Sequence, residues 1–309
     1  MDLSIFIALL AATVVAGTPI LFAAIGELLT ERSGILNLGV EGMMLVGAVL
    51  GFIFTINTGN HWYGFAAALV GGGMMGAIHA FITITLRGNQ VVSGLALTIF
   101  GSGVSGFMGK AYQGVPIVDP FKHAPVPLLK DIPVLGPVLF RHDVLVYLSI
   151  VLVILMWYVL YRTSWGLSIR SAGENPAAAD AVGINVARVR YICTIMGGVL
   201  AGLGGAYLSL AYAPSWQEDM TAGRGWIAVA LVIFALWNPL RGLVGAYLFG
   251  GVEAMTFRMQ AAGIKISPFF LSMLPYILTI LVLTIVTIRL RQEAGAPAAL
   301  GVPYDREER

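Results

Sequence analysis

The chain has 309 residues, of which 58% are hydrophobic and only 11% are charged, and its mean hydropathy is +0.86. Soluble domains contain roughly 25% charged residues, so this composition excludes an ordinary water-soluble protein and requires a lipid bilayer around the chain. The formal net charge of +2 gives no indication of nucleic acid as a partner. The single cysteine, Cys193, excludes an intramolecular disulfide and a cysteine metal cluster.

Uncharged apolar stretches predict the membrane spans, because a helix needs about 20 apolar residues to cross the hydrocarbon. In chain order they cover residues 3–26, 42–86, 88–109, 144–161, 191–217, 225–252 and 266–288. The second is long enough for two spans with a break at 57–61, and 225–252 is interrupted at 238–242, which leaves two pieces too short to cross comfortably. We therefore expect an all-α, polytopic transmembrane helical bundle of about eight membrane segments with broken or short helices.

The positions of the arginines predict the orientation of the chain. Residues 162–190 contain four arginines, and further arginines follow the last span. With both regions in the cytoplasm, the turns 27–32, 87–90 and 238–242 also face inward. The N-terminus and the loops 57–62, 110–143 and 213–223 then lie outside.

The cytoplasmic loop 162–190 contains the signals of a short helix over about 175–182. Asn175 suits the N-cap, Pro176 the first turn, and Gly183 a left-handed helix end. A helix of about two turns is unstable alone in water, so it must pack against something. A groove on another protein and the spans of this chain are both compatible with the pattern.

Two groups of residues resemble a known family. Part of the loop resembles the segment that docks onto the ATPase subunit in permeases of binding-protein-dependent ABC importers, in the branch that includes the branched-chain amino acid, ribose and nucleoside permeases. The residues that carry this resemblance, with the helix signals above, are Gly166, Arg170, Ala172, Gly173, Glu174, Asn175, Pro176, Ala178, Ala179, Gly183 and Ile184. The stretch 26–44 is similar to the signature of the nucleoside (guanosine-type) and simple-sugar group, as are residues 88–94 and 237–239. The resemblance covers about residues 1–290.

The resemblance implies a type II-like permease subunit: a single permease domain over 1–290 and a cytoplasmic tail over 291–309. It implies a multi-pass protein of the bacterial cytoplasmic (inner) membrane, with no cofactor or metal and no enzyme activity of its own, because ATP hydrolysis resides on separate ATPase subunits. Further implied partners are a second, related permease and a periplasmic or lipoprotein solute-binding protein. The implied substrate is a nucleoside or related small polar solute; a simple sugar such as ribose and branched-chain amino acids are the alternatives.

Polar side chains at membrane depth are costly and tend to face the bundle interior or a wet cavity. On this ground the candidates for the translocation pathway are Asn37, Glu41, Asn89, Gln90, Ser93, Trp237 and Asn238. Asn37 and Glu41 are four residues apart, and we expect them on one face of a helix. The alternative is structural: Asn37 caps a helix and Glu41 pairs with Arg32.

Two other functions compete with an importer subunit. The first is an intramembrane hydrolase: residues 103–106, Gly-Val-Ser-Gly, match a short serine-hydrolase motif, with His79 as the candidate base. A match of four residues is weak support, and a packed, hydrogen-bonded histidine is the simpler interpretation of His79. Broken helices also suit a stand-alone secondary transporter or channel. No nucleotide-binding motif occurs in the sequence, which is consistent with ATP hydrolysis on another chain.

Overall fold

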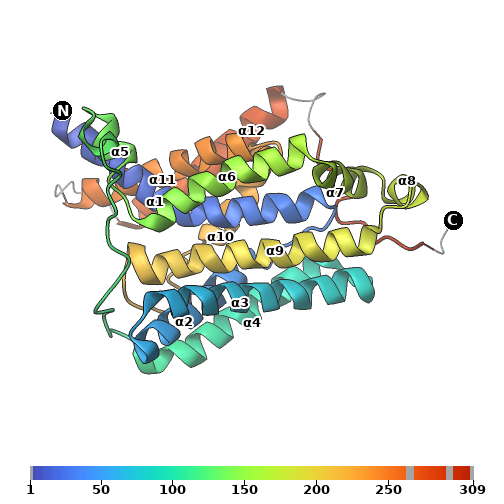
Figure 1. Cartoon of the computed structure of the whole chain (residues 1–309), viewed down its shortest axis with the longest axis horizontal. Coiled ribbons are helices and arrows are strands. Elements are labelled where there is room, and N and C mark those ends of the chain that lie inside the picture. Colours follow the sequence, from blue (N-terminus) through green and yellow to red (C-terminus); the bar gives the residue numbers. More distant parts are fainter. Residues whose placement is uncertain (1–2, 262–267, 290–294, 307–309) are drawn as a thin grey trace.

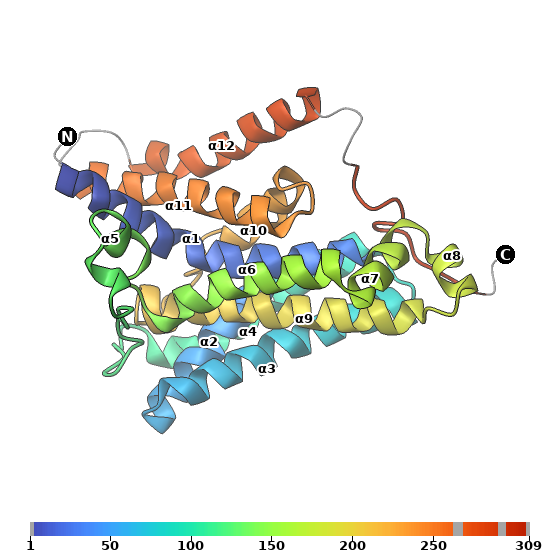
Figure 2. The same ribbon diagram turned by 45° about the horizontal axis from the view of Figure 1, so that its top comes forward.

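The computed structural model describes residues 3–261, 268–289 and 295–306. Long helices run side by side along the longest dimension of the molecule (Figure 1). One end carries the N-terminus and α5, and the opposite end carries α7, α8 and the C-terminus (Figures 1 and 2). The helices are α1 (Leu3–Arg32), α2 (Val40–Thr58), α3 (His61–Ala80), α4 (Gln90–Gly109), α5 (Leu135–Leu139), α6 (Val144–Arg162), α7 (Ser164–Glu174), α8 (Pro176–Ala181), α9 (Val186–Tyr207), α10 (Arg224–Phe234), α11 (Pro239–Ala261) and α12 (Pro268–Arg289).

Within the described residues, six helices are long and apolar enough to cross a membrane: α1, α2, α3, α4, α6 and α9. A π-helical turn extends α3 over Phe81–Thr85, and another extends α9 over Leu208–Tyr212. Shorter helices complete the bundle, so the prediction of an all-α, polytopic membrane protein is confirmed. The expected break between the second and third spans lies at 59–60, where Gly59 is left-handed and Asn60 caps α3.

Two predicted boundaries are wrong. Residues 27–32 are not a turn but the last turns of α1, in which Glu27 and Glu31 are buried. The break at 238–242 does leave one short piece, the 11-residue α10, but the second piece continues beyond 252 to give the 23-residue α11. At 1.5 Å per residue α11 is about 35 Å long, so its length alone matches a crossing, although it is not among the six helices that are also apolar enough.

Helix α9 packs against α1, α2 and α3 through small residues. A Cβ added at Gly202 would lie 2.6 Å from the Ala68 carbonyl oxygen, and one at Gly26 would lie 2.6 Å from the carbonyl oxygen of Gly197. Backbones this close exclude any side chain larger than hydrogen. The glycines therefore allow the close approach that holds helices together in lipid, where the hydrophobic effect does not.

The loop after α4 lies against the end of the bundle that carries the N-terminus. The amide of Ile117 donates to the carbonyl of Pro214 at 3.0 Å, and that of Phe121 donates to Leu210 at 3.2 Å. The ring of Phe121 packs against His61 and Trp62. This loop is thus fixed to the segment after α9 and to the start of α3.

Candidate functional site

The loop between α6 and α9 contains two consecutive capped helices. Thr163 accepts a hydrogen bond from the amide of Gly166 (3.1 Å) at the start of α7, and Asn175 accepts one from Ala178 (2.9 Å) at the start of α8. Pro176 occupies the first position of α8, and Gly183, with φ of +89°, follows its last turn. The short helix predicted over about 175–182 is confirmed as Pro176–Ala181, whereas α7 was not predicted.

One side of this loop is anchored on the chain itself. Gly166, Gly173 and Ala179 are buried, and a Cβ on Gly173 would overlap the carbonyl of Arg32. The Arg170 guanidinium lies over the ring of Tyr161, 5.4 Å from its centroid. These predicted loop residues therefore position α7 and α8 against the ends of α1 and α6.

The other side of the loop is open. Glu174, Asn175 and Ala178 are exposed, as are Ala177, Ala181 and Gly183, and Val182 shows 77% of its surface. An exposed valine among alanines forms a smooth apolar face at an end of the molecule that is otherwise rich in arginine. Such a face is suited to a protein groove.

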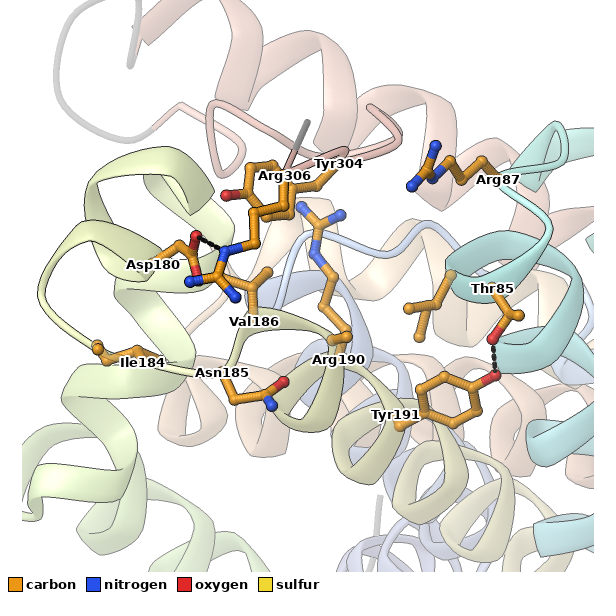
Figure 3. A pocket seen from close by; sticks show the side chains of 13 residues that line it. Thr85, Arg87, Asp180, Ile184, Asn185, Val186, Arg190, Tyr191, Tyr304 and Arg306 are labelled. Atoms are coloured by element: carbon orange, nitrogen blue, oxygen red, sulfur yellow. Dashed lines mark hydrogen bonds and ion pairs between the residues drawn. The ribbon is translucent and has the colours of Figure 1, made fainter. Parts of the chain in front are cut away.

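A pocket of about 530 Å³ lies beside this loop, between the start of α9, the end of α3 and the C-terminal residues 304–306. Figure 3 shows Arg306 paired with Asp180 on one wall and the hydrogen-bonded pair Thr85 and Tyr191 on another. The pocket lies at the end of the bundle that carries α8, and polar and apolar residues both line it. Two of its arginines, Arg87 and Arg306, are paired with acidic residues.

The connection between α1 and α2, residues 33–39, is not helical although it lies buried among helices. Its peptide groups bond to side chains from three helices. The amide of Leu36 donates to Gln90 (2.7 Å) and its carbonyl contacts the His79 ring (3.0 Å); the amide of Asn37 donates to Glu27 (3.2 Å), and the carbonyl of Leu38 accepts from Thr98 (2.9 Å). Irregular backbone is tolerated inside a membrane protein only when its polar groups are satisfied in this way.

The prediction that Asn37 and Glu41 share a helix face is wrong. Asn37 lies in the irregular connection, where its side chain accepts from the amide of Gly39 at 3.0 Å, and α2 begins only at Val40. The reason is local: Gly34 has φ of +95° and Gly39 precedes the helix, so the chain unwinds between them.

Glu41 holds the beginning of α10. Its carboxylate accepts from the hydroxyl of Thr221 (2.6 Å) and from the amides of Gly223 (2.9 Å) and Gly225 (2.6 Å). The first amides of a helix have no partner within it and favour a negative charge. The alternative pairing of Glu41 with Arg32 is not formed, because Arg32 donates to the carbonyl of Trp237 instead.

Trp237 and Asn238 form the turn between α10 and α11. The indole of the buried Trp237 donates to Glu31 at 2.5 Å, while the half-buried Asn238 accepts from the amide of Leu240 at 3.0 Å. Leu236 and Trp237 both have positive φ. The turn is therefore tied to the end of α1 by hydrogen bonds.

The three candidates at the start of α4 lie on one continuous helix. Asn89 is exposed and accepts from the amide of Val92 at 3.0 Å, as an N-cap. Gln90 and Ser93 are buried; Ser93 contacts the His79 ring at 2.9 Å. The structure thus brings Gln90, Ser93 and Asn37 together around the connection 33–39, whereas Glu41, Asn238 and Asn89 lie apart from one another.

The buried Glu27 and Glu31 and the half-buried Thr98 also belong to these hydrogen-bond networks but were not among the sequence candidates. Two acidic residues four apart at the end of an apolar helix were the available signal. Among the described residues, no group of three or more His, Cys, Asp or Glu is arranged to hold a metal ion. The proposed hydrolase pair does not form: His79 contacts Ser93, and Ser105 accepts from the Trp216 indole at 3.4 Å.

A bundle of apolar helices with irregular, internally satisfied backbone and a capped loop at one end defines a multi-pass membrane protein. Residues 9–283 match the family described as the branched-chain amino acid transport system permease component. The chain belongs to this family of ABC importer permeases. Family membership agrees with the prediction that the chain is not itself an enzyme.

Named relatives align over almost the whole chain. A putative glucose ABC transporter permease, TsgC13 of Haloferax volcanii, is 43% identical over 97% of this chain and 98% of its own. The guanosine permease NupQ of Bacillus subtilis is 36% identical over 96% of each chain, and the nucleoside permease NupC of Lactococcus lactis is 37% identical over 93% of each. A second glucose permease of Haloferax volcanii, TsgB13, is 24% identical over 82% of this chain. No solved structure matches.

Proposed function

We propose that this chain transmits ATP-driven movement from cytoplasmic ATPase subunits to a membrane pathway that imports a solute built around a sugar ring. The observation that carries this proposal is the arrangement of α7 and α8. One side of the loop is held on the chain, and the other exposes a short, capped, apolar helix at the basic end of the bundle.

Helix α8 is suited to this role because it cannot be stable alone. Six residues make less than two turns, and isolated helices of this length are marginal in water. Its N-cap and its left-handed end pre-form the helix, so a partner groove binds it with little loss of conformational entropy. The glycine and arginine contacts of α7 then pass a push on α8 to the ends of α1 and α6.

The proposal includes three protein partners and a location in the cytoplasmic membrane. ATPase subunits bind α8 on the inner side, and a second, related permease completes the pathway. Two glucose permeases of Haloferax volcanii align with this chain, which supports a pair of related subunits. A solute-binding protein docks on the opposite end, where the ordered loop after α4 lies. The permease domain then comprises residues 1–290 and the tail 291–309 is cytoplasmic.

The sugar ring is proposed because it is shared by the solutes in the relatives' names, glucose on one side and guanosine or other nucleosides on the other. Within this class, the resemblance of residues 26–44 favours a nucleoside, whereas the relative at 43% identity is named for glucose. Asn37, Glu41, Asn89, Gln90, Ser93, Trp237 and Asn238 remain proposed as pathway residues. Their present hydrogen bonds are structural, so a role in transport requires that some of them exchange partners.

Uptake of labelled guanosine, glucose, ribose and leucine into cells that express the whole operon tests the substrate. Competition by both glucose and nucleoside, or by one of them, supports a sugar-containing solute, and uptake of leucine alone overturns it. For the coupling role, Glu174→Ala with Asn175→Ala is expected to abolish uptake and solute-stimulated ATP hydrolysis while the protein still inserts. Solute movement by the purified chain alone would instead support a stand-alone transporter or channel.

A further inference from the structure

The C-terminal residues 295–306 cross the end of the bundle as a strap beside the α7–α8 loop (Figure 2). The amide of Ala298 donates to the Glu174 carboxylate at 3.2 Å, and the amide of Ala299 donates to the carbonyl of Gly173 at 2.9 Å. Farther along, the amide of Gly301 donates to the carbonyl of Gly34 at 3.2 Å. The strap is therefore bound to the end of α7 and to the connection that follows α1.

Arg190 fixes the middle of the strap. This buried guanidinium donates to the carbonyls of Ser33 (3.1 Å), Ala172 (3.5 Å) and Val302 (3.3 Å). These three carbonyls belong to the segment after α1, to α7 and to the strap. Because one charged group on α9 bonds to all three segments, it ties them to one another.

The strap ends in two ion pairs that lead to different elements. Arg306 pairs with Asp180 of α8 at 3.0 Å, and the preceding residue, Asp305, pairs with Arg87 in the connection between α3 and α4. The pocket of about 530 Å³ is lined by Arg87 and by Asp180, so it lies between the two elements. Figure 3 shows Arg306 reaching Asp180 on one side of this space and Arg87 on the other.

We infer that the C-terminal strap carries the displacement of α8 across this gap to the entrance of α4. Asp180 and Arg306 act as positioning residues at one end of the strap, and Asp305 and Arg87 at the other. Without the strap, a push on α8 reaches the end of α3 only through α9, whose Tyr191 is hydrogen-bonded to Thr85. The strap adds a second link that leads from α8 to Arg87 itself. The inference rests on the proposed coupling role of α8.

The test uses the complete importer reconstituted in proteoliposomes, with solute uptake and ATP hydrolysis measured together. Asp180→Arg and Arg306→Asp are each expected to lower the solute moved per ATP by up to about fivefold, the range of an exposed or half-exposed ion pair. The double variant, with the charges exchanged, is expected to restore the ratio. Arg241→Asp is the matched control for Arg306→Asp, since it makes the same charge change at an exposed position of α11 and should leave the ratio unchanged.

A second arm excludes misfolding as the cause. Cys193 is the single cysteine of the chain and is buried. In the double variant Asp180→Cys with Arg306→Cys, a cross-linker should therefore react with the two introduced thiols and not with Cys193. Before linkage by a short bifunctional maleimide this variant should couple poorly, and after linkage it should couple as the wild type does.

The outcomes separate the two proposals. If the wild-type importer hydrolyses ATP without solute uptake, the proposed function fails. The inference is overturned if the wild type and the single variants move the same amount of solute per ATP. It is also overturned if neither the charge-exchanged variant nor the linked cysteine variant restores the wild-type ratio.

Discussion

Removing the cap of α8 should weaken coupling far more than removing an identical cap elsewhere. Asn175 accepts from the amide of Ala178 at 2.9 Å, and Asn185 accepts from the amide of Arg188 at the same distance. Replacing either by alanine costs about 1 kcal/mol of helix stability. The chemistry of the two changes is the same, so Asn185→Ala is a matched control for Asn175→Ala.

Helices α8 and α9 differ in the contacts, other than the cap, that hold them in place. Helix α8 has six residues and one buried side chain, Ala179, whose methyl group contributes about 0.8 kcal/mol on burial. Loss of the cap is therefore comparable to the stabilisation that burial gives α8, and the ratio of unwound to wound helix should rise about fivefold. Helix α9 has 22 residues and is buried along most of its length, so only its first turn should fray.

The assay is hydrogen exchange of the amides of 177–184, together with solute-stimulated ATP hydrolysis by the assembled importer. Asn175→Ala should accelerate exchange in this segment about fivefold and lower the stimulation, whereas Asn185→Ala should do neither. Asn175→Asp keeps an acceptor and adds a charge favourable at a helix start, so it should behave as the wild type. Equal effects of the two alanine variants, or a failure of aspartate to rescue, would refute the reasoning.

Four further predictions concern stability and pH. Gln90→Leu leaves the amide of the half-buried Leu36 without its acceptor and should lower the free energy of unfolding in detergent by about 1–3 kcal/mol. A change below a few tenths of a kcal/mol, as expected for the exposed control Asn89→Ser, contradicts this. Trp237→Phe removes the donor to Glu31 and should cost about 1–3 kcal/mol, seen as a lower Tm. Gly202→Val should prevent α9 from approaching α3, because even a Cβ lies 2.6 Å from Ala68 oxygen, and should reduce the folded yield more than Gly103→Val, where the space is open. Burial lowers the pKa of His142 in the loop before α6, so the unfolded loop binds the proton more readily than the folded one. The stability of the loop should therefore be complete above the ordinary histidine pKa and fall as the pH drops through the lowered pKa. Amide exchange at two pH values checks this, and His142→Gln should remove the dependence.

Local signals in the sequence were sufficient to predict the membrane spans and the position of α8. Asn175, Pro176 and Gly183 act on their own backbone within one or two turns, so their meaning does not depend on the rest of the fold. The break at 57–61 is local for the same reason. The structure confirms both.

Long-range contacts explain what the sequence could not predict. Glu41 finds its partners 180 residues and more away, at the start of α10, and nothing near it in the sequence indicates this. The predicted apolar stretch ends at 252, immediately before Glu253, whereas in the structure α11 continues through this residue and Arg224 from α10 pairs with it. Likewise, the connection 33–39 unwinds because buried side chains from elsewhere bond to its backbone.

That connection has a mechanical consequence for transport. Its peptide groups are bonded to α1 through Glu27, to α3 through His79, and to α4 through Gln90 and Thr98. None of these helices can slide along another without breaking a bond to the same short piece of backbone. The three helices therefore resist sliding past one another, and they should move together as one unit in the proposed transport cycle.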